Sequence, residues 1–256
     1  MSGLIRFDLH PLADADWRAQ CRAQLEQHGA LVLRQFLQPA ALQAIITEGN
    51  AQRHLAWHTR SNHNVYLLKT DETLSADHPR NRDVISTKGC ITDEAIAHDS
   101  PLRQLYNDTL FKQFLCDVLN ESALYPYADP LSSINLHYAA QGQELGWHFD
   151  NSSFAITLLL QKPQAGGVFQ YVRDLRDADA GEMNYEGVAA VLNEARTPDA
   201  LAIEAGDLVL FRGRNSLHRV TPTEGDITRM LAVLAYNTQP GIALSETARM
   251  TFYGRL

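Results

Sequence analysis

The sequence predicts a mainly β protein, a jelly roll or closed barrel with helices packed against its outside. Short β-rich runs separated by turn-forming residues recur after about residue 130, whereas the first half carries apolar residues at helical spacing. Many short strands after a helical start are typical of two sheets closed against each other. We find no internal repeat and no low-complexity linker. Residues 1–256 are therefore predicted to form a single domain, with 1–129 as a helix-rich support and 130–256 as the β core.

Composition narrows the class of protein further. The chain has 256 residues, of which 45% are hydrophobic and 20% charged, and its formal net charge is −8. No lysine- or arginine-rich run is present, so nucleic acid is not an expected partner. The longest apolar runs fall far short of the roughly 20 residues that span a bilayer, and the start does not resemble a secretory signal. Three cysteines without close spacing suit a reducing cytoplasm. Both a monomer and a homodimer remain open.

Helical spacing recurs in three segments of the first half. We expect a first helix through Trp17, Cys21 and Leu25 that stops at Gly29, followed by a strand at residues 30–33. A second helix is expected to begin at Pro39 and to carry Leu42, Ile45 and Ile46 on its apolar face. A third is expected to begin at Ser100 and Pro101 and to bury apolar residues from Leu102 to Val118. Residues 50–98 are polar and lack a clear period, so we assign them no element.

The second half is expected to supply the strands. Turn formers such as Gln141-Gly142 and Ala205-Gly206 separate most of them. The expected strands are Ile134–Ala139, Phe154–Gln161, Gly167–Val172, Asp207–Phe211, Met230–Tyr236 and Met250–Tyr253. Residues Tyr185–Ala195 are the exception, because Val188, Val191 and Leu192 have the spacing of a helix inserted between strands.

The segment Gly146–Asp150 (Gly-Trp-His-Phe-Asp) carries the first part of a candidate metal site. In an extended segment, side chains two residues apart point to the same side, so His148 and Asp150 can converge on one ion. His218 follows the predicted strand Asp207–Phe211, which can lie beside the first in a closed double sheet. Two imidazoles and one carboxylate on one face of a metal are typical of non-haem iron(II) oxygenases. The alternative is that His148 hydrogen-bonds in a barrel mouth and that Asp150 begins a turn.

Two further residues fit a cosubstrate. Arg229 stands at the start of the apolar strand Met230–Tyr236, where a guanidinium would face an apolar barrel unless an anion paired with it. The 5-carboxylate of 2-oxoglutarate is such an anion, and bidentate pairing suits its geometry. Tyr138 lies on the strand Ile134–Ala139, from which its hydroxyl could support the same cosubstrate. The alternatives are an exposed arginine at a strand edge and a tyrosine in the core.

At this point the chain resembles the iron(II)/2-oxoglutarate-dependent oxygenase superfamily, through residues 145–150, 166–169, 206–211 and 216–220. The resemblance implies a double-stranded β-helix over about residues 130–256. It also implies Fe(II), 2-oxoglutarate and O2 as cofactor and cosubstrates, with release of succinate and carbon dioxide. More narrowly, the chain is similar to a bacterial subgroup of hydroxylases and radical halogenases that act on free amino acids, through residues 148–151, 211–214 and 217–220.

One position distinguishes the two activities of that subgroup. The resemblance implies that halogenases replace the carboxylate ligand by a small residue, so that chloride takes the vacant position on iron. This chain has Asp150, which would block chloride by size and by charge. We therefore expect hydroxylation of a small molecule, a free amino acid or a derivative, although desaturation and cyclisation use the same ligands. A peptidyl or protein hydroxylase and a non-catalytic metal-binding barrel or sensor are the alternatives.

The candidates for substrate contact are polar or aromatic residues near these motifs: Trp147, Asn151, Arg214, Arg219, His63 and Asn64. Asn151 directly follows the ligand motif, but it could equally cap the next turn. The two arginines flank the distal histidine and could instead form surface ion pairs, and the tryptophan is expected to pack at the barrel rim. His63 and Asn64 belong to the polar tract 60–66, which could close the site as a lid or remain a solvated loop.

Overall fold

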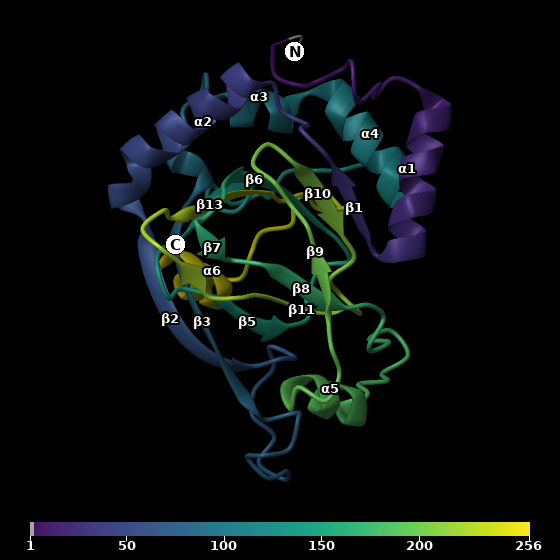
Figure 1. Cartoon of the computed structure of the whole chain (residues 1–256), viewed down its shortest axis with the longest axis vertical. Coiled ribbons are helices and arrows are strands. Elements are labelled where there is room, and N and C mark those ends of the chain that lie inside the picture. The colour runs from purple at the N-terminus through teal and green to yellow at the C-terminus, as the bar shows by residue number, and fades with distance from the viewer. Residues whose placement is uncertain (1–2) are drawn as a thin grey trace.

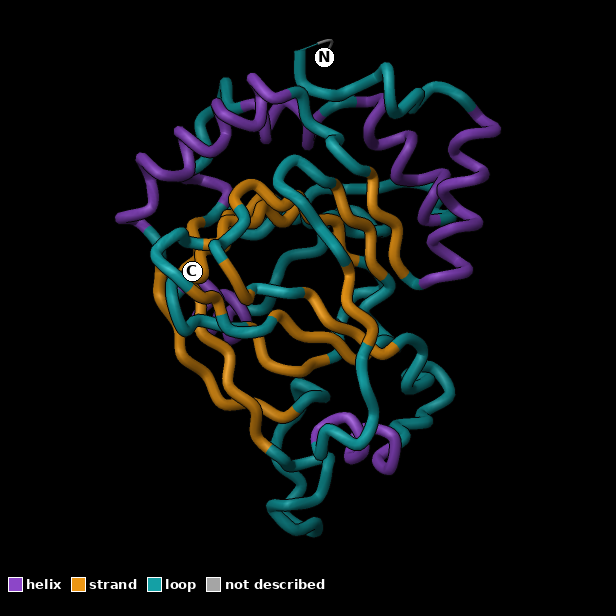
Figure 2. Tube along the Cα trace, in the orientation of Figure 1, coloured by secondary structure: helices purple, strands orange, loops and turns teal. Residues whose placement is uncertain are grey.

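Two antiparallel sheets face each other in the computed structural model, which describes residues 3–256 apart from the side chain of Thr247 (Figure 1; Figure 2). The larger sheet contains, in spatial order, β1 (Ala30–Leu33), β10 (Leu208–Phe211), β6 (Ala155–Gln161), β13 (Arg229–Leu234), β4 (Ile134–Ala139), β3 (Asp83–Ile91) and β2 (Trp57–Asn64). The smaller sheet contains β5 (Leu145–His148), β11 (Leu217–Val220), β8 (Phe169–Val172) and β9 (Asp199–Leu201). A separate pair joins β7 (Ala165–Gly166) to β12 (Thr223–Glu224). The predicted class, a mainly β double-stranded helix with flanking helices, is confirmed.

Four helices cover the outer face of the larger sheet (Figure 1). They are α1 (Ala15–His28), α2 (Pro39–Gln52), α3 (Pro101–Asn107) and α4 (Thr109–Leu119), and the short 3-10 helices η1 (Arg53–Leu55) and η2 (Asp93–Ala95) follow α2 and β3. The first helix begins at the Asp14 cap, whose carboxylate accepts from Trp17 N. It ends at Gly29 with φ 69°, which is the stop that the sequence predicts. Within residues 3–256, no helix has the length and apolar content needed to cross a bilayer.

The predicted single helix after Ser100 is in fact two helices, α3 and α4. Asp108 separates them, because its backbone is extended (φ −67°, ψ 129°) and its side chain accepts from Phe111 N at 2.7 Å. An aspartate in this position caps a new helix better than it continues an old one. The predicted buried side is correct, since Leu102, Leu105, Phe114, Leu115 and Val118 all lie in the core.

The unassigned tract 50–98 contains the β2–β3 hairpin at residues 57–91, which extends the larger sheet beyond β4. The predicted strand Met250–Tyr253 is wrong, because these residues lie in α6 (Glu246–Tyr253). The hydroxyl of Ser245 accepts from Ala248 N, and Gly254 at φ 69° ends the helix. These caps outweigh the strand preference of a short aromatic run. The inserted helix is present as α5 (Tyr185–Leu192), with Val188 and Val191 buried.

Alternation along the strands of the larger sheet separates two environments. On β4 and β13, Leu136, Tyr138, Met230 and Ala232 belong to the main core under the helices. Their neighbours therefore face the smaller sheet. On β5 and β11, Trp147 and Leu217 belong to a second core that packs against α5. The residues between these positions consequently face one another across the interior of the double sheet.

Candidate metal centre

His148, Asp150 and His218 meet in the interior between the two sheets. Strands β5 and β11 are neighbours in the smaller sheet (Figure 1). Their register places His218 opposite His148, and the two ring centroids are 4.1 Å apart. Asp150 follows β5, and its Oδ1 lies 3.6 Å from His148 Nε2 and 3.5 Å from His218 Nε2. One ligand atom from each residue lies within 4.8 Å of the other two. The three predicted ligands are thus brought together in a geometry that one metal ion can satisfy.

The strand that presents His218 differs from the sequence prediction. The strand expected to lie beside His148 is β10, but β10 pairs with β1 and β6 in the larger sheet. His218 lies instead on β11, a strand of its own in the smaller sheet. The short connection at residues 212–216 therefore carries the chain from one sheet to the other.

Both imidazoles are held with Nε2 directed toward the centre. His148 Nδ1 lies 2.8 Å from Gly146 O, and His218 Nδ1 lies 2.9 Å from Ser216 O. A carbonyl oxygen only accepts, so each Nδ1 carries the proton and each Nε2 keeps its lone pair for a metal. Burial, and then the nearby His218, lower the pKa of His148 to about 3, which keeps this imidazole neutral.

The carboxylate of Asp150 lacks a partner for one oxygen. Among residues 3–256, Asp150 Oδ2 is buried and accepts no hydrogen bond. Burial by itself raises the pKa of Asp150, but His218 and then His148 outweigh it and lower the pKa overall. A desolvated anion with a free oxygen is costly unless a cation binds it. The donor set therefore fits a divalent metal.

Gly213 provides the space that Asp150 occupies. A Cβ at Gly213 would lie 1.8 Å from Asp150 Oδ2, and Gly213 O accepts a hydrogen bond from Asp150 N at 3.1 Å. We expect Gly213→Ala to displace the carboxylate and to weaken iron(II) binding by about 10- to 100-fold, as for other residues that position metal ligands. Anaerobic iron(II) titration measures this effect, with Gly3→Ala as the control because a Cβ at Gly3 would meet no atom within 4 Å. An unchanged iron affinity would contradict the role of Gly213.

Arg229 brings an unpaired cation into the same interior. Its side chain is 7% exposed, and its Nε has no hydrogen-bond partner in the described part of the chain. Burial lowers the pKa of Arg229 to about 10, so the guanidinium stays charged at neutral pH. A Cβ at Gly167 would lie 3.0 Å from Arg229 Cδ, so glycine leaves room for the arginine beside β7. A buried, charged guanidinium without a carboxylate indicates a site for an anion.

The structure corrects the prediction for Tyr138. Its hydroxyl donates to Gly49 O of α2 at 2.7 Å, and the side chain is 1% exposed. Tyr138 therefore lies on the helix-covered face of β4, on the opposite side from the metal centre. Tyr138 is thus a core tyrosine.

Trp147 and Arg219 also point away from the metal centre, which corrects their assignment as substrate contacts. Each neighbours a ligand in sequence, so alternation places it on the outer face of the smaller sheet. The Arg219 guanidinium lies 4.7 Å from the centroid of the Trp147 ring, and its Nε donates to Gln170 Oε1 at 2.7 Å.

The two candidates of the polar tract separate in the structure. Asn64 is a structural turn residue: its Oδ1 accepts from the backbone N–H of Tyr66 and Leu68, which corrects its assignment to the substrate. His63 lies near the centre, with its ring centroid 6.5 Å from that of His148 and its Nε2 2.7 Å from Ser86 Oγ.

The loop after the ligand motif is tied to the surface by Arg214. Its Nη1 donates to Asn151 O at 3.1 Å, and its Nη2 forms an ion pair with Asp179 at 2.7 Å. Arg214 is thus engaged in the surface ion pair weighed as the alternative to substrate binding. The exposed Asn151 remains a candidate because of its position beside Asp150.

Several residues near the metal centre were not predicted as site residues from the sequence. Phe211 and Phe169 pack against His218, with ring centroids 4.8 and 5.5 Å away. The Arg176 guanidinium lies 4.1 Å from the Phe149 ring centroid, and its Nη2 lies 3.5 Å from Asp150 O. The two phenylalanines belong to segments that the sequence did single out, whereas nothing local marks Arg176.

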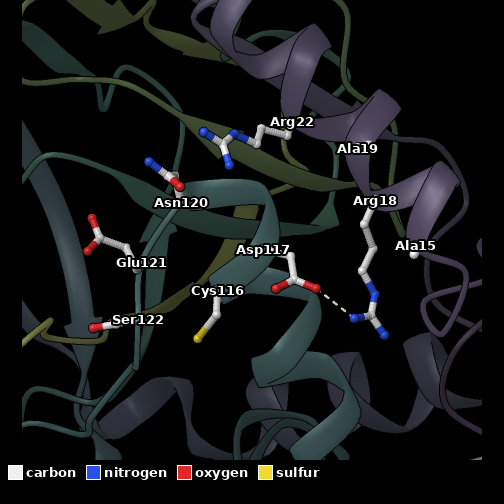
Figure 3. Close-up of a pocket in the computed structure, with 9 residues that line it drawn as sticks. All are labelled: Ala15, Arg18, Ala19, Arg22, Cys116, Asp117, Asn120, Glu121 and Ser122. Atoms are coloured by element: carbon white, nitrogen blue, oxygen red, sulfur yellow. Dashed lines mark hydrogen bonds and ion pairs between the residues drawn. The ribbon is translucent and has the colours of Figure 1, made fainter.

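A hollow between α1 and α4 has no part in the metal centre. Its volume is about 520 Å³, and Arg18 and Asp117 form an ion pair of 2.6 Å within it (Figure 3). None of its lining residues belongs to the strands that carry the ligands. The metal centre instead lies on the other side of the larger sheet from these helices.

Comparison with known proteins agrees with this architecture. One similar solved structure is an oxidoreductase of the 2OG-Fe(II) oxygenase family from Burkholderia pseudomallei, at 15% identity over 88% of this chain and 92% of that chain, with a TM-score of 0.55. A second is a prolyl-4-hydroxylase from Pseudomonas putida, at 13% identity over 85% of this chain and 98% of that chain, with a TM-score of 0.51. A third is the non-heme alpha ketoglutarate dependent epimerase SnoN from nogalamycin biosynthesis, at 14% identity over 87% of this chain and 81% of that chain, with a TM-score of 0.60. At these identities they show a shared fold. A search of curated proteins finds no match.

The fold and the two-histidine, one-carboxylate centre define the class: the iron(II)/2-oxoglutarate oxygenase superfamily. The predicted resemblance to that superfamily is thereby confirmed. Within it, the chain belongs to the family described as Halogenase D, whose model matches residues 13–251.

Proposed function

We propose that this protein is an Fe(II)- and 2-oxoglutarate-dependent oxygenase that hydroxylates a small molecule, a free amino acid or a derivative of one. The observation that carries the proposal is the complete ligand set of His148, Asp150 and His218 with a buried carboxylate oxygen left unpaired. SnoN, which shares the fold, has been solved with Fe3+ and alpha ketoglutarate. When bound here, iron and 2-oxoglutarate would supply the oxidising chemistry, with succinate and carbon dioxide leaving.

The chain contributes placement and exclusion of water. His148 Nε2, His218 Nε2 and the Asp150 carboxylate would hold the metal, and Arg229 would pair with the far carboxylate of 2-oxoglutarate. The rings of Phe169 and Phe211 pack on one side of His218 and shield it from solvent. His63, near His148, would face the substrate rather than the metal.

Asp150 supports hydroxylation over halogenation. Its carboxylate lies between both imidazoles, and the missing side chain of Gly213 makes the space for it. Chloride would have to enter a position that a carboxylate already fills, against the charge of that carboxylate. Halogenation is the second candidate, because the family is described as Halogenase D.

Anaerobic addition of Fe(II) and 2-oxoglutarate tests whether the centre is catalytic or merely binds a metal. We expect a weak visible charge-transfer band that requires both components, because the ligand set leaves positions for a chelating cosubstrate. His218→Ala provides the matched control and should lose the band, because it removes one of the two imidazole ligands. A wild-type protein that binds iron but gives no band with 2-oxoglutarate would be a non-catalytic barrel.

A succinate-release screen then identifies the reaction. The protein with Fe(II) and 2-oxoglutarate is incubated aerobically with free amino acids or a peptide library, in buffer that contains chloride and bromide. The masses of the products are then measured by mass spectrometry. We expect release with a free amino acid or derivative and the gain of one oxygen. A product in which a halogen replaces hydrogen would overturn hydroxylation, and release with peptides alone would favour a peptidyl hydroxylase.

A further inference from the structure

Lys88 and His137 form a polar pair inside the double sheet that the metal centre does not use. Cys90 lies opposite His137 in the β3–β4 register, and alternation puts Lys88 on the same face of β3. That face looks toward the smaller sheet, because the neighbouring Tyr138 packs under the helices. Lys88 Nζ lies 3.4 Å from His137 Nε2 and 3.5 Å from Nδ1. An ammonium group thus meets an imidazole in the interior.

No acid balances this ammonium group. Among residues 3–256, Lys88 forms no ion pair, and burial lowers its pKa with only the Cys90 thiol acting in the opposite direction. Burial, then Lys88 and Arg229, lower the pKa of His137 well below its usual value, so this imidazole is neutral. Lys88 and His137 are both half-buried, and a partly desolvated cation is stabilised when an anion joins it.

The other charges of the proposed centre already balance. Divalent iron, the Asp150 carboxylate, doubly negative 2-oxoglutarate and the Arg229 guanidinium sum to zero, so none of these anions is left over for Lys88. A carboxylate on a molecule bound beside the metal would give the Lys88 ammonium group its partner.

The position of Lys88 assigns that group to the substrate rather than to 2-oxoglutarate. In the larger sheet, β13 with Arg229 lies on one side of β4, and β3 with Lys88 lies on the other. Ser86, two residues before Lys88 on the same face, accepts from Gly146 N at 3.0 Å, and Gly146 O holds His148. At about 3.3 Å per residue, Lys88 lies roughly 7 Å further along β3 than Ser86. A small molecule can span that distance.

The C-terminal helix closes this end of the interior. Tyr253 Oη donates to Asn135 Oδ1 at 3.0 Å, and the Phe252 ring centroid lies 5.9 Å from Lys88 Nζ. A group bound at Lys88 would therefore have α6 as its neighbour on this side, with Tyr253 buried and Phe252 41% exposed.

We propose that Lys88 and His137 form a subsite for a carboxylate of the substrate, with Phe252 at its border. The ammonium group pairs with one carboxylate oxygen, and an imidazole N–H donates to the carboxylate as well. The inference rests on the proposed function, which places iron and 2-oxoglutarate. It specifies a substrate with a free carboxylate, held by residues outside the metal and cosubstrate sites.

Isothermal titration of the anaerobic protein loaded with Fe(II) and 2-oxoglutarate tests the subsite. The probes are the common L-amino acids and, for each one that binds, its carboxamide. We expect Lys88→Met to weaken binding of the free acids by about tenfold or more while the carboxamides bind both proteins equally weakly. Lys88→Arg, which keeps the charge, should restore part of the affinity. Lys162→Met is the control, since Lys162 forms a surface ion pair with Glu204.

The 2-oxoglutarate titration of the visible band separates the possible failures. We expect the same 2-oxoglutarate affinity in wild type and Lys88→Met. Three results would overturn the subsite. The first is that Lys88→Met loses affinity for 2-oxoglutarate instead, and the second is that carboxamides bind as well as the free acids. The third is that no free acid binds at all. Absence of the band in the wild type would instead overturn the proposed function.

Discussion

His218→Ala is expected to leave a folded protein that neither retains iron(II) nor releases succinate. The variant removes one of two imidazoles whose Nε2 atoms lie beside Asp150 Oδ1. Metal ions contribute several kcal/mol to reactions at such centres, so we expect activity to fall by about a thousandfold or more. Iron content after anaerobic dialysis and succinate release measure the two effects.

The matched control for this prediction is His54→Ala. His54 is an exposed histidine whose Nδ1 lies 3.0 Å from the nearby Ala51 O, and it has no place in the centre. Both iron content and succinate release should match the wild type in this variant. Full iron retention by His218→Ala would show that the centre does not use this histidine.

Arg229→Met is expected to raise the Michaelis constant for 2-oxoglutarate with little effect on iron binding. Removing one member of a buried charged pair costs about 2–5 kcal/mol. At about 1.4 kcal/mol per tenfold, the affinity should fall by roughly 30- to 4,000-fold. Methionine fills the space of the aliphatic part of the arginine side chain. The loss of 2-oxoglutarate affinity therefore measures the contribution of the guanidinium group.

Two further variants show whether the change in the Michaelis constant is specific to the guanidinium group of Arg229. Arg229→Lys should recover only part of the affinity, because an ammonium group cannot pair bidentately with a carboxylate. Arg173→Met should behave as wild type, since Arg173 forms an exposed ion pair with Asp174. A Michaelis constant that stays unchanged in Arg229→Met would remove Arg229 from the cosubstrate site.

Features that depend on residues close together in the chain were predicted correctly from the sequence. The Ser100 cap, the Gly29 stop and the Pro39 helix start are local, and the structure contains each of them. His148 and Asp150 could be paired because side chains two apart share a side in extended backbone.

The same alternation could not decide which set of residues faces the site. Every residue of β4 is at least partly buried, because one face packs under helices and the other faces the smaller sheet. Tyr138 and His137 were therefore equivalent in sequence terms, and the structure sends Tyr138 to α2 and His137 to the interior. Trp147 and Arg219 were misassigned for the same reason.

By itself, then, the sequence determined the double-sheet class, most element positions and the residue types of the candidate metal centre, since these follow from short-range spacing and residue chemistry. Only the tertiary structure decided that β11 rather than β10 lies beside β5, and that the unassigned hairpin brings Lys88 to the interior. The physical reason is that strand pairing between distant segments sets the two faces of each strand, whereas a period of two shows only that neighbours point apart.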